Sequence, residues 1–304
     1  MLFRTTTEAD LGNLLDCVVE EPVSWADPDR LTAFLKDGNY THDRIWIAED
    51  EGKILARAVW WGFPVGGPLA LDCVYVDASV TDRVTLAADL LAAAHEAFGT
   101  KPEYHVFLPS GWRDDPAVVA AVGWRREALA RNGLDGTLER LRFEWTGGVP
   151  AASDRLVFSQ EPDDEVFAQA FQRVAVGTLD AHTRAELAVK DAAAQARDDV
   201  AGYRSLPGDR SWWRLAHTPD GDLVGLAIAS ANAGGPTVGY LGVVPEHRGR
   251  GYVADLLNEI TRSHAERGAT RIVADTDTGN VPMAAAFERA GYRVFAVRLV
   301  TSES

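Results

Sequence analysis

Apolar and polar positions alternate along the chain in two similar series of segments. In the first series, a period of two predicts strands at residues 44–50, 53–62, 69–77, 103–109 and 140–145. Apolar residues spaced as on one helix face predict a helix over 86–99. A shorter helix over 115–124 is expected to end at Gly123, because glycine often terminates helices.

The second series repeats this order of segments. Strands are predicted at 211–219, 223–231, 237–244, 271–277 and 294–300. Helices are predicted from Val253 to His264, with Leu256, Leu257 and Ile260 on the apolar face, and over 281–292. The repeat predicts the α/β (α+β) class: two tandem domains, each a mixed, mostly antiparallel twisted sheet flanked by helices.

The stretch "TGGVPAASD", residues 146–154, is the predicted linker, because it is rich in Gly, Pro and small residues between apolar segments. It divides the chain into domains 1–145 and 155–304. Since a tandem duplication can imitate a dimer within one chain, we expect a monomer.

Composition narrows the function. The chain has 304 residues and a net charge of −15, and this acidity argues against nucleic-acid and anionic-membrane partners. No apolar leader and no run of roughly 20 apolar residues occurs, so a cytoplasmic protein is expected. Cys17 and Cys73 have neither a metal-ligand nor a disulfide spacing, and no metal site is predicted.

A cluster of Arg and Gly stands out against this acidity. The sequence "RGRGYV", residues 248–253, lies between a strand and a helix. Gly249 and Gly251 leave no side chain over the backbone, and the amides at a helix N-terminus attract phosphate. Arg248 and Arg250 add positive charge. The cluster therefore predicts a diphosphate site.

Other interpretations of the cluster remain open. Residues 249–254 fit G-x-G-x-x-A, the fingerprint of dinucleotide-binding proteins, which would make the protein an oxidoreductase of the NAD type. That fingerprint normally follows its strand directly, whereas "PEHR" intervenes here. A surface turn that opens a helix is the plainest alternative.

The wider context resembles the GNAT superfamily of acetyl-CoA-dependent N-acetyltransferases. The resemblance rests on the strand end Val243-Val244-Pro245, followed by Arg248, Gly251 and Val253. Further along the chain it rests on Asn280, which precedes a helix that ends in Gly291-Tyr292. Val253 departs from the Gly or Ala that is usual in this family. The order of tandem parts is similar to that of the mycothiol synthases.

The resemblance implies acetyl-CoA as cosubstrate and assigns residues to it. The diphosphate would be held by Arg248, Gly249, Arg250, Gly251, Tyr252 and Val253, and the pantetheine arm by the backbone of Leu241, Gly242 and Val243. Small Gly239 and Gly242 are expected to let that arm approach closely. Asn280 would contact the arm or cap its own helix, and Phe287 belongs to the same region.

The first domain lacks these features. Its corresponding stretch, "VYVDASVTDRVTLAADLL", contains no glycine. We therefore expect residues 1–145 to be a degenerate GNAT-like domain that does not bind CoA.

Catalytic candidates follow from the resemblance and from residue chemistry. Asp275, at the end of a strand, is the candidate base, and Asp277 is expected to point to the same side and to raise its pKa. The alternative is that both solvate a strand end or bind a cationic substrate. Phe287 occupies the place of the family's usual acid, a tyrosine. Tyr240 or Tyr292 would then protonate the thiolate, or it would leave unassisted.

Substrate contacts are expected from the segment before the second hairpin. Asp180 and His182 would face the substrate, with His182 as a base or a substrate contact, but a solvated helix face is the favoured alternative. Trp213 would line the pocket unless it is core. The sequence thus predicts acetyl transfer to an amine, expected to be a small molecule, by direct attack in the second domain. A non-catalytic acyl-CoA-binding module is the rival interpretation.

Overall fold

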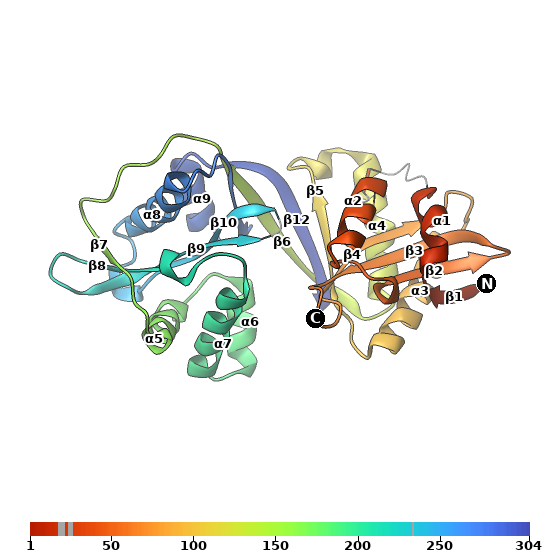
Figure 1. Cartoon of the computed structure of the whole chain (residues 1–304), viewed down its shortest axis with the longest axis horizontal. Helices are drawn as coiled ribbons and strands as arrows, with labels where there is room; N and C mark the ends of the chain where they lie inside the picture. Colours follow the sequence, from red (N-terminus) through yellow and green to blue (C-terminus); the bar gives the residue numbers. More distant parts are fainter. Residues whose placement is uncertain (18–21, 24–26, 233) are drawn as a thin grey trace. The chain divides into compact units, whose positions relative to one another are not determined.

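The computed structural model describes residues 1–17, 22–23, 27–232 and 234–304 (Figure 1). These residues form two compact units. Unit 1 comprises Met1–Glu139 and Val297–Ser304, and unit 2 comprises Arg140–Ala296.

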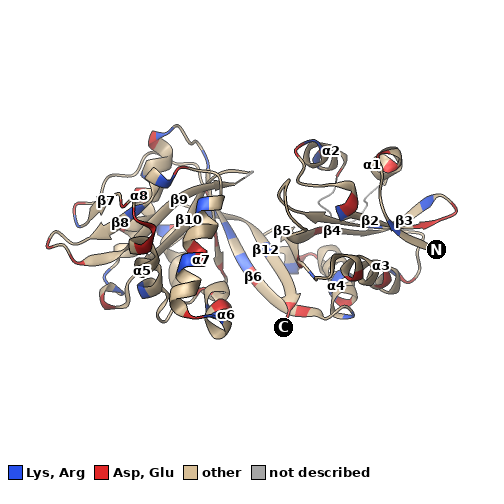
Figure 2. Ribbon diagram, turned by 60° about the horizontal axis from the view of Figure 1, so that its bottom comes forward, with Lys and Arg blue, Asp and Glu red and all other residues tan. Residues whose placement is uncertain are grey.

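Unit 1 contains a sheet in which β1, β2, β3 and β4 are antiparallel neighbours and β5 is parallel to β4. Residues 297–301 of the last strand complete it beside β5. Helices α1 and α2 cover one face and α3 and α4 the other (Figures 1 and 2). The elements are β1 Leu2–Thr5, α1 Leu11–Leu15, α2 Pro28–Lys36, β2 Ile45–Asp50, β3 Lys53–Trp61, β4 Ala70–Val76, α3 Arg83–Phe98, β5 Glu103–Leu108 and α4 Pro116–Ala130.

Unit 2 repeats this plan. Strands β7, β8, β9 and β10 are antiparallel neighbours, β11 is parallel to β10, and residues 140–145 of β6 pair with β11. Helices α5, α6 and α7 lie on one face and α8 and α9 on the other (Figure 1). The elements are β6 Leu134–Trp145, β7 Val157–Ser159, α5 Asp164–Ala175, α6 Ala181–Val189, α7 Ala192–Ser205, β8 Arg214–His217, β9 Leu223–Asn232, β10 Gly235–Val243, α8 Tyr252–Glu266, β11 Ile272–Asp277, α9 Val281–Arg289 and β12 Arg293–Glu303.

Both units therefore have a mostly antiparallel sheet with one parallel pair and helices on both faces, as the sequence predicted. The helix face expected from Leu256, Leu257 and Ile260 is buried, with at most 1% of each residue exposed. Residues of both charges are interspersed along the helices (Figure 2). None of the described helices is long and apolar enough to cross a membrane.

Several boundaries differ from expectation. Helix α4 continues through Gly123 to Ala130, so the prediction that it ends at Gly123 was wrong. A glycine inside a helix costs about 1 kcal/mol relative to alanine, and the burial of Arg125 and Leu129 beyond it outweighs that cost. The strand expected from residue 211 begins at Arg214, since residues 210–212 form a 3₁₀ turn.

The division into units also differs from the expected split at 145 and 155. Residues 146–154 have no helix or strand, but they lie inside unit 2. The last strand of each sequence half is long, and its far end belongs to the other unit: β6 passes into unit 2 at Arg140, and β12 passes into unit 1 at Val297.

Candidate active site

Unit 2 contains a cavity of about 590 Å³. Its walls come from β10, from the turn and loop before α8, from the end of β11 and the start of α9, and from helices α6 and α7. All of its lining residues belong to this unit. Fourteen of the predicted site residues line it: Asp180, His182, Tyr240, Leu241, Gly242, Val243, Arg248, Gly249, Gly251, Tyr252, Val253, Asp275, Asn280 and Phe287.

The loop before α8 has the geometry of an anion site. Gly249 and Gly251 have φ angles of 75° and 79°, which L-residues rarely adopt. Gly251 is the N-cap of α8 and supplies no side-chain cap. Among the described residues, the amides of 249–253 donate no hydrogen bond to the protein. These amides and the positive end of the helix dipole are therefore available to a phosphate.

The side chain of Arg248 holds this loop in place through hydrogen bonds to the backbone. Its guanidinium donates to the carbonyl oxygens of Val243 at 3.0 Å, Val174 at 2.8 Å and Gly177 at 3.4 Å. It thereby ties the loop to the end of β10, to the last turn of α5 and to the segment after α5. Arg250, in contrast, is exposed and is absent from the cavity lining. Arg248 therefore holds the loop in shape, whereas the sequence had suggested only its charge.

Strand β10 leaves its parallel neighbour soon after they meet. Their register contains the single pair Thr237↔Val273, whereas β10 stays paired with β9 as far as Val243. A β-bulge between Val238 and Tyr240 bends the strand at this point. The edge of β10 beyond Thr237 thus faces the cavity and can accept an extended ligand as an additional strand.

The glycines of β10 have a different purpose from the one expected. A Cβ on Gly242 would lie 2.0 Å from Cγ1 of Val174 on α5, and a Cβ on Gly239 would lie 2.8 Å from Cβ of Ser230. These positions must be glycine because α5 and β9 approach the strand. Gly239 and Gly242 are therefore needed for packing within the protein, and the expectation that they make room for the ligand gains no support.

Asn280 and Phe287 border the cavity from α9. Asn280 is the N-cap of this helix, but its side chain makes no capping hydrogen bond, so the capping alternative gains no support. Phe287 is 2% exposed and stacks on Phe143 with ring centroids 4.9 Å apart. Val253, the unusual residue of the motif, lines the cavity half-buried.

The two candidate carboxylates of β11 are held by arginines of β6. Nε of Arg142 lies 3.2 Å from Oδ1 of Asp275, and Nε of Arg140 lies 3.1 Å from Oδ1 of Asp277. Asp277 is 4% exposed, does not line the cavity, and accepts the amide of Ala181 at 2.7 Å. The two side chains share a side of the strand as predicted, but each carboxylate is paired with an arginine, and Asp277 anchors the start of α6.

The two tyrosines considered as the acid, Tyr240 and Tyr292, differ in their position relative to the cavity. Tyr240 lines the cavity, and burial raises the pKa of its phenol, which therefore keeps its proton at neutral pH. Tyr292 is 3% exposed, lies outside the cavity lining, and its hydroxyl is 2.6 Å from Oγ1 of Thr261. Trp213 is core as well: it is 3% exposed and packs edge-on against Phe167, so the expectation that it lines the pocket was wrong.

Sequence reasoning missed the contribution of helix α7. Asp199 and Tyr203 line the cavity beside Asp180 and His182 of the α6 segment. Burial raises the pKa of Asp199 to about 6, while the hydrogen bond from Gln195 opposes that shift. The signal was present as the spacing i, i+4, i+8 of Gln195, Asp199 and Tyr203, which lie on one helix face.

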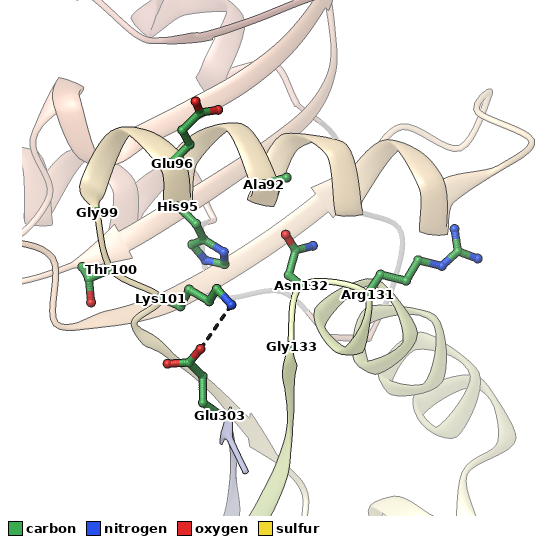
Figure 3. Close-up of a pocket in the computed structure, with 10 residues that line it drawn as sticks. All are labelled: Ala92, His95, Glu96, Gly99, Thr100, Lys101, Arg131, Asn132, Gly133 and Glu303. Atoms are coloured by element: carbon green, nitrogen blue, oxygen red, sulfur yellow. Dashed lines mark ion pairs between the residues drawn. The ribbon is translucent and has the colours of Figure 1, made fainter.

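Unit 1 has a cavity of its own, of about 740 Å³, in a different place (Figure 3). His95 of α3 points into it near Lys101, whose ammonium is 3.1 Å from a carboxylate oxygen of Glu303. His95 is 6% exposed, and neither of its ring nitrogens has a partner among the described residues.

The place in unit 1 that matches the loop before α8 is closed. The N-cap of α3 is Asp82, whose carboxylate accepts the amide of Thr85 at 3.0 Å. An internal carboxylate thus occupies the helix end that is uncapped in unit 2. Buried Arg125 of α4 also donates from Nε to the carbonyl oxygen of Val74 on β4 at 2.9 Å.

Comparison with known proteins agrees with this geometry. Residues 160–292 match the model of the acetyltransferase (GNAT) family. This segment is a GNAT acetyltransferase domain. The match contains the whole cavity except Arg140, and it includes the loop before α8.

Solved structures extend the fold likeness beyond the GNAT domain. A GCN5-related N-acetyltransferase from Sphaerobacter thermophilus has a TM-score of 0.61 at 16% identity, with 99% of this chain and 94% of that chain covered. A GNAT-family acetyltransferase from Colwellia psychrerythraea has a TM-score of 0.51 at 11% identity over 100% of both chains. Both units therefore share the fold of GNAT proteins.

Proteins of the GNAT family use acetyl-CoA as cosubstrate. In the described ranges, no group of three or more His, Cys, Asp or Glu side chains is arranged to hold a metal ion.

Proposed function

We propose that the GNAT domain transfers an acetyl group from acetyl-CoA to the amine of a small molecule by direct attack. The observation that carries this proposal is the uncapped start of α8, where the amides of 249–253 face the cavity beside two glycines with positive φ. A diphosphate would receive these hydrogen bonds, and Arg248 would keep the loop in shape.

The rest of CoA would follow the edge of β10. The backbone of Leu241, Gly242 and Val243 would pair with the amides of the pantetheine arm, and Asn280 would bind the arm from α9. The free amides of this strand are also suited to polarise the thioester carbonyl, which develops negative charge when the amine attacks.

Tyr240 is the proposed acid. It is the cavity-lining tyrosine on β10, and the raised pKa of its phenol keeps it protonated until the thiolate of CoA leaves. Phe287 cannot serve, since it has no ionisable group. The domain's base is Asp275 by family resemblance, although its ion pair with Arg142 weakens that assignment.

Unit 1 is proposed to bind no CoA. Asp82 satisfies the helix start where a phosphate would lie, and Arg125 satisfies a carbonyl of the strand that corresponds to β10. The tandem order resembles that of the mycothiol synthases, but no described contact selects their substrate. We further propose a cytoplasmic monomer with one working site.

Titration calorimetry with acetyl-CoA and with NAD tests the binding part of the proposal. We expect one acetyl-CoA per chain with micromolar or better affinity and no binding of NAD. Tight NAD binding would support the oxidoreductase interpretation instead. Release of free CoA thiol in the presence of a panel of amines then distinguishes an enzyme from a non-catalytic acyl-CoA-binding module. The replacement of the usual tyrosine by Phe287 favours the binding module.

A further inference from the structure

Several polar groups face one wall of the GNAT cavity, and one of them, the hydroxyl of Tyr240, already has a role in the function proposed above. They are the ring of His182, atom Oδ2 of Asp199 and the hydroxyls of Tyr203 and Tyr240. Within the described part of the chain, none of them has a hydrogen-bond partner; Asp199 accepts only at Oδ1, from Gln195 at 3.0 Å. His182 is exposed, whereas Asp199, Tyr203 and Tyr240 are partly buried. Since polar groups inside proteins are normally paired, these three unpaired groups facing one cavity indicate a polar ligand.

The charge on this wall comes mainly from Asp199. Asp180 already uses Oδ1 for the amide and hydroxyl of Thr183, at 2.8 and 2.9 Å, and its Oδ2 lies 3.9 Å from Arg140. The neighbouring Asp198 is exposed and paired with Lys190 at 3.2 Å. Asp199 is therefore the half-buried carboxylate that remains able to meet a cation.

Aromatic rings lie beside this carboxylate. The rings of Tyr203 and Tyr240 have centroids 6.0 Å apart. Phe171 packs against both, at 5.9 and 4.9 Å, and so fixes their orientation. A carboxylate next to aromatic faces is the combination that binds ammonium groups, through charge and through cation–π attraction.

We propose that Asp199, His182, Tyr203 and Tyr240 form the acceptor subsite, that it takes a compact amine in its ammonium form, and that Asp199 removes the ammonium proton. This inference rests on the proposed function. It moves the role of base from Asp275, which is held by Arg142, to a carboxylate on α7.

The step balances in atoms and charge. The ammonium gives one proton to the carboxylate of Asp199, which later returns it to solvent. The neutral amine then attacks the thioester carbonyl carbon: the C–N bond forms and the C–S bond breaks. The thiolate takes a proton from Tyr240, and the second proton of the nitrogen restores the phenol of Tyr240. One ammonium and one acetyl-CoA give one acetamide, one CoA thiol and one free proton.

The surroundings of Asp199 suit a base that works near neutral pH. Burial raises the pKa of its carboxyl to about 6, and Asp180 and Asp198 act in the same direction. Gln195 and His182 oppose the shift. The carboxylate is thus ionised at pH 7, and its proton affinity is higher than that of an exposed aspartate, which favours proton removal from the ammonium.

The test uses the full chain and two probes that are ammonium ions at pH 7, n-butylamine and phenethylamine. Phenylalanine is the matched counterpart of phenethylamine, with the same ammonium group and an added carboxylate. The variant Asp199→Asn keeps the acceptor oxygen for Gln195 but removes the charge. Asp198→Asn, on the same helix outside the cavity, is its control, and Asp275→Asn tests the alternative base. Thermal unfolding and acetyl-CoA affinity are measured for every variant.

We expect turnover of both amines and at least a tenfold preference for phenethylamine over phenylalanine. Asp199→Asn should lower kcat/KM about 100-fold. It should also abolish the loss of kcat/KM that the wild type shows below pH 6, and leave the Kd of acetyl-CoA unchanged. Asp198→Asn should stay within about twofold of wild type.

The inference is overturned if Asp199→Asn keeps both its rate and its acidic limb, or if Asp275→Asn alone removes that limb. It is also overturned if the wild type binds acetyl-CoA but acetylates neither ammonium probe. A wild type that does not bind acetyl-CoA would instead refute the proposed function, and the subsite with it, so the two failures are distinguishable.

Discussion

Arg125 donates a hydrogen bond to the carbonyl oxygen of Val74 at 2.9 Å and so fills the fork between β4 and β5. These strands are paired only through Ala70 and Leu71, and they separate as β10 and β11 do in unit 2. The same fork is thus closed by a buried side chain in one unit and lines a cavity in the other. The extension of α4 beyond Gly123 is what brings Arg125 to this place.

Gly251 should be essential for acetyl-CoA binding but not for folding. An added Cβ would meet nothing in the protein closer than Nη2 of Arg155 at 3.9 Å, but it would lie beside the amides at the start of α8 and is strained at φ 79°. We expect Gly251→Ala to raise the Kd of acetyl-CoA at least tenfold, measured by calorimetry. Gly268→Ala, at φ 90° beyond the other end of α8, is the control and should leave the Kd unchanged.

Replacement of Arg248 should affect stability and acetyl-CoA binding more strongly than replacement of Arg250, two residues away. Arg248→Ala removes donors to three backbone carbonyls, so we expect a loss of about 2 kcal/mol in unfolding free energy and a Kd for acetyl-CoA raised at least tenfold. Arg250→Ala, at an exposed position, should preserve stability and weaken binding only a few-fold. Urea unfolding and calorimetry check both variants. Equal effects would mean that Arg248 acts through charge alone.

Tyr240→Phe should slow the chemical step without affecting acetyl-CoA affinity. The expected fall in kcat is about tenfold, because a thiol of pKa near 8.5 is a tolerable leaving group even unassisted. Tyr292→Phe is the matched variant: it loses the bond to Thr261 and some stability but should keep kcat. Steady-state release of CoA decides between them, and a normal kcat for Tyr240→Phe would remove this residue from the mechanism.

Two buried histidines should make the fold sensitive to mild acid. Burial lowers the pKa of His95 and of His264 from 6.5 to about 4. Between these values the unfolded chain binds protons that the folded chain excludes, so stability falls as pH drops from about 6.5 towards 4. Urea midpoints across this range measure the slope, and His95→Leu should reduce it, whereas replacement of the partly exposed His217 by Gln should not.

Much of the fold was accessible from the sequence because burial enforces periodicity. The apolar face of α8 and the alternating strands β9 and β10 were predicted within a few residues. Helices α5 and α7 were missed, although α5 has a clear apolar face of Phe167, Phe171 and Val174. The far ends of β6 and β12 were not foreseen either, since strand length beyond a domain boundary depends on pairing between residues distant in sequence.

The candidate site likewise contains residues that could be predicted from the sequence and residues that could not. Gly249, Gly251 and the start of α8 were predictable because a helix end needs only local sequence to become an anion site. Asp199 was not, since its proposed role depends on burial beside Tyr203 and on the absence of a cationic partner among the residues that the structure describes. Conversely, Asp275 and Asp277 attracted attention by their spacing, but Arg142 and Arg140 on β6, a strand from the other half of the sequence, hold them.

The path of the chain makes unit 2 an insertion within unit 1: the polypeptide leaves unit 1 after Glu139 and re-enters it at Val297. A fragment that ends at Trp145 would therefore lack the strand that covers β5, and a fragment that starts at Arg155 would lack the strand that pairs with β11. Each would expose the backbone edge of an incomplete sheet, and such edges promote aggregation. Separation of the two units by genetic truncation thus requires cuts that follow the sheets, with residues 297–304 joined to the first unit.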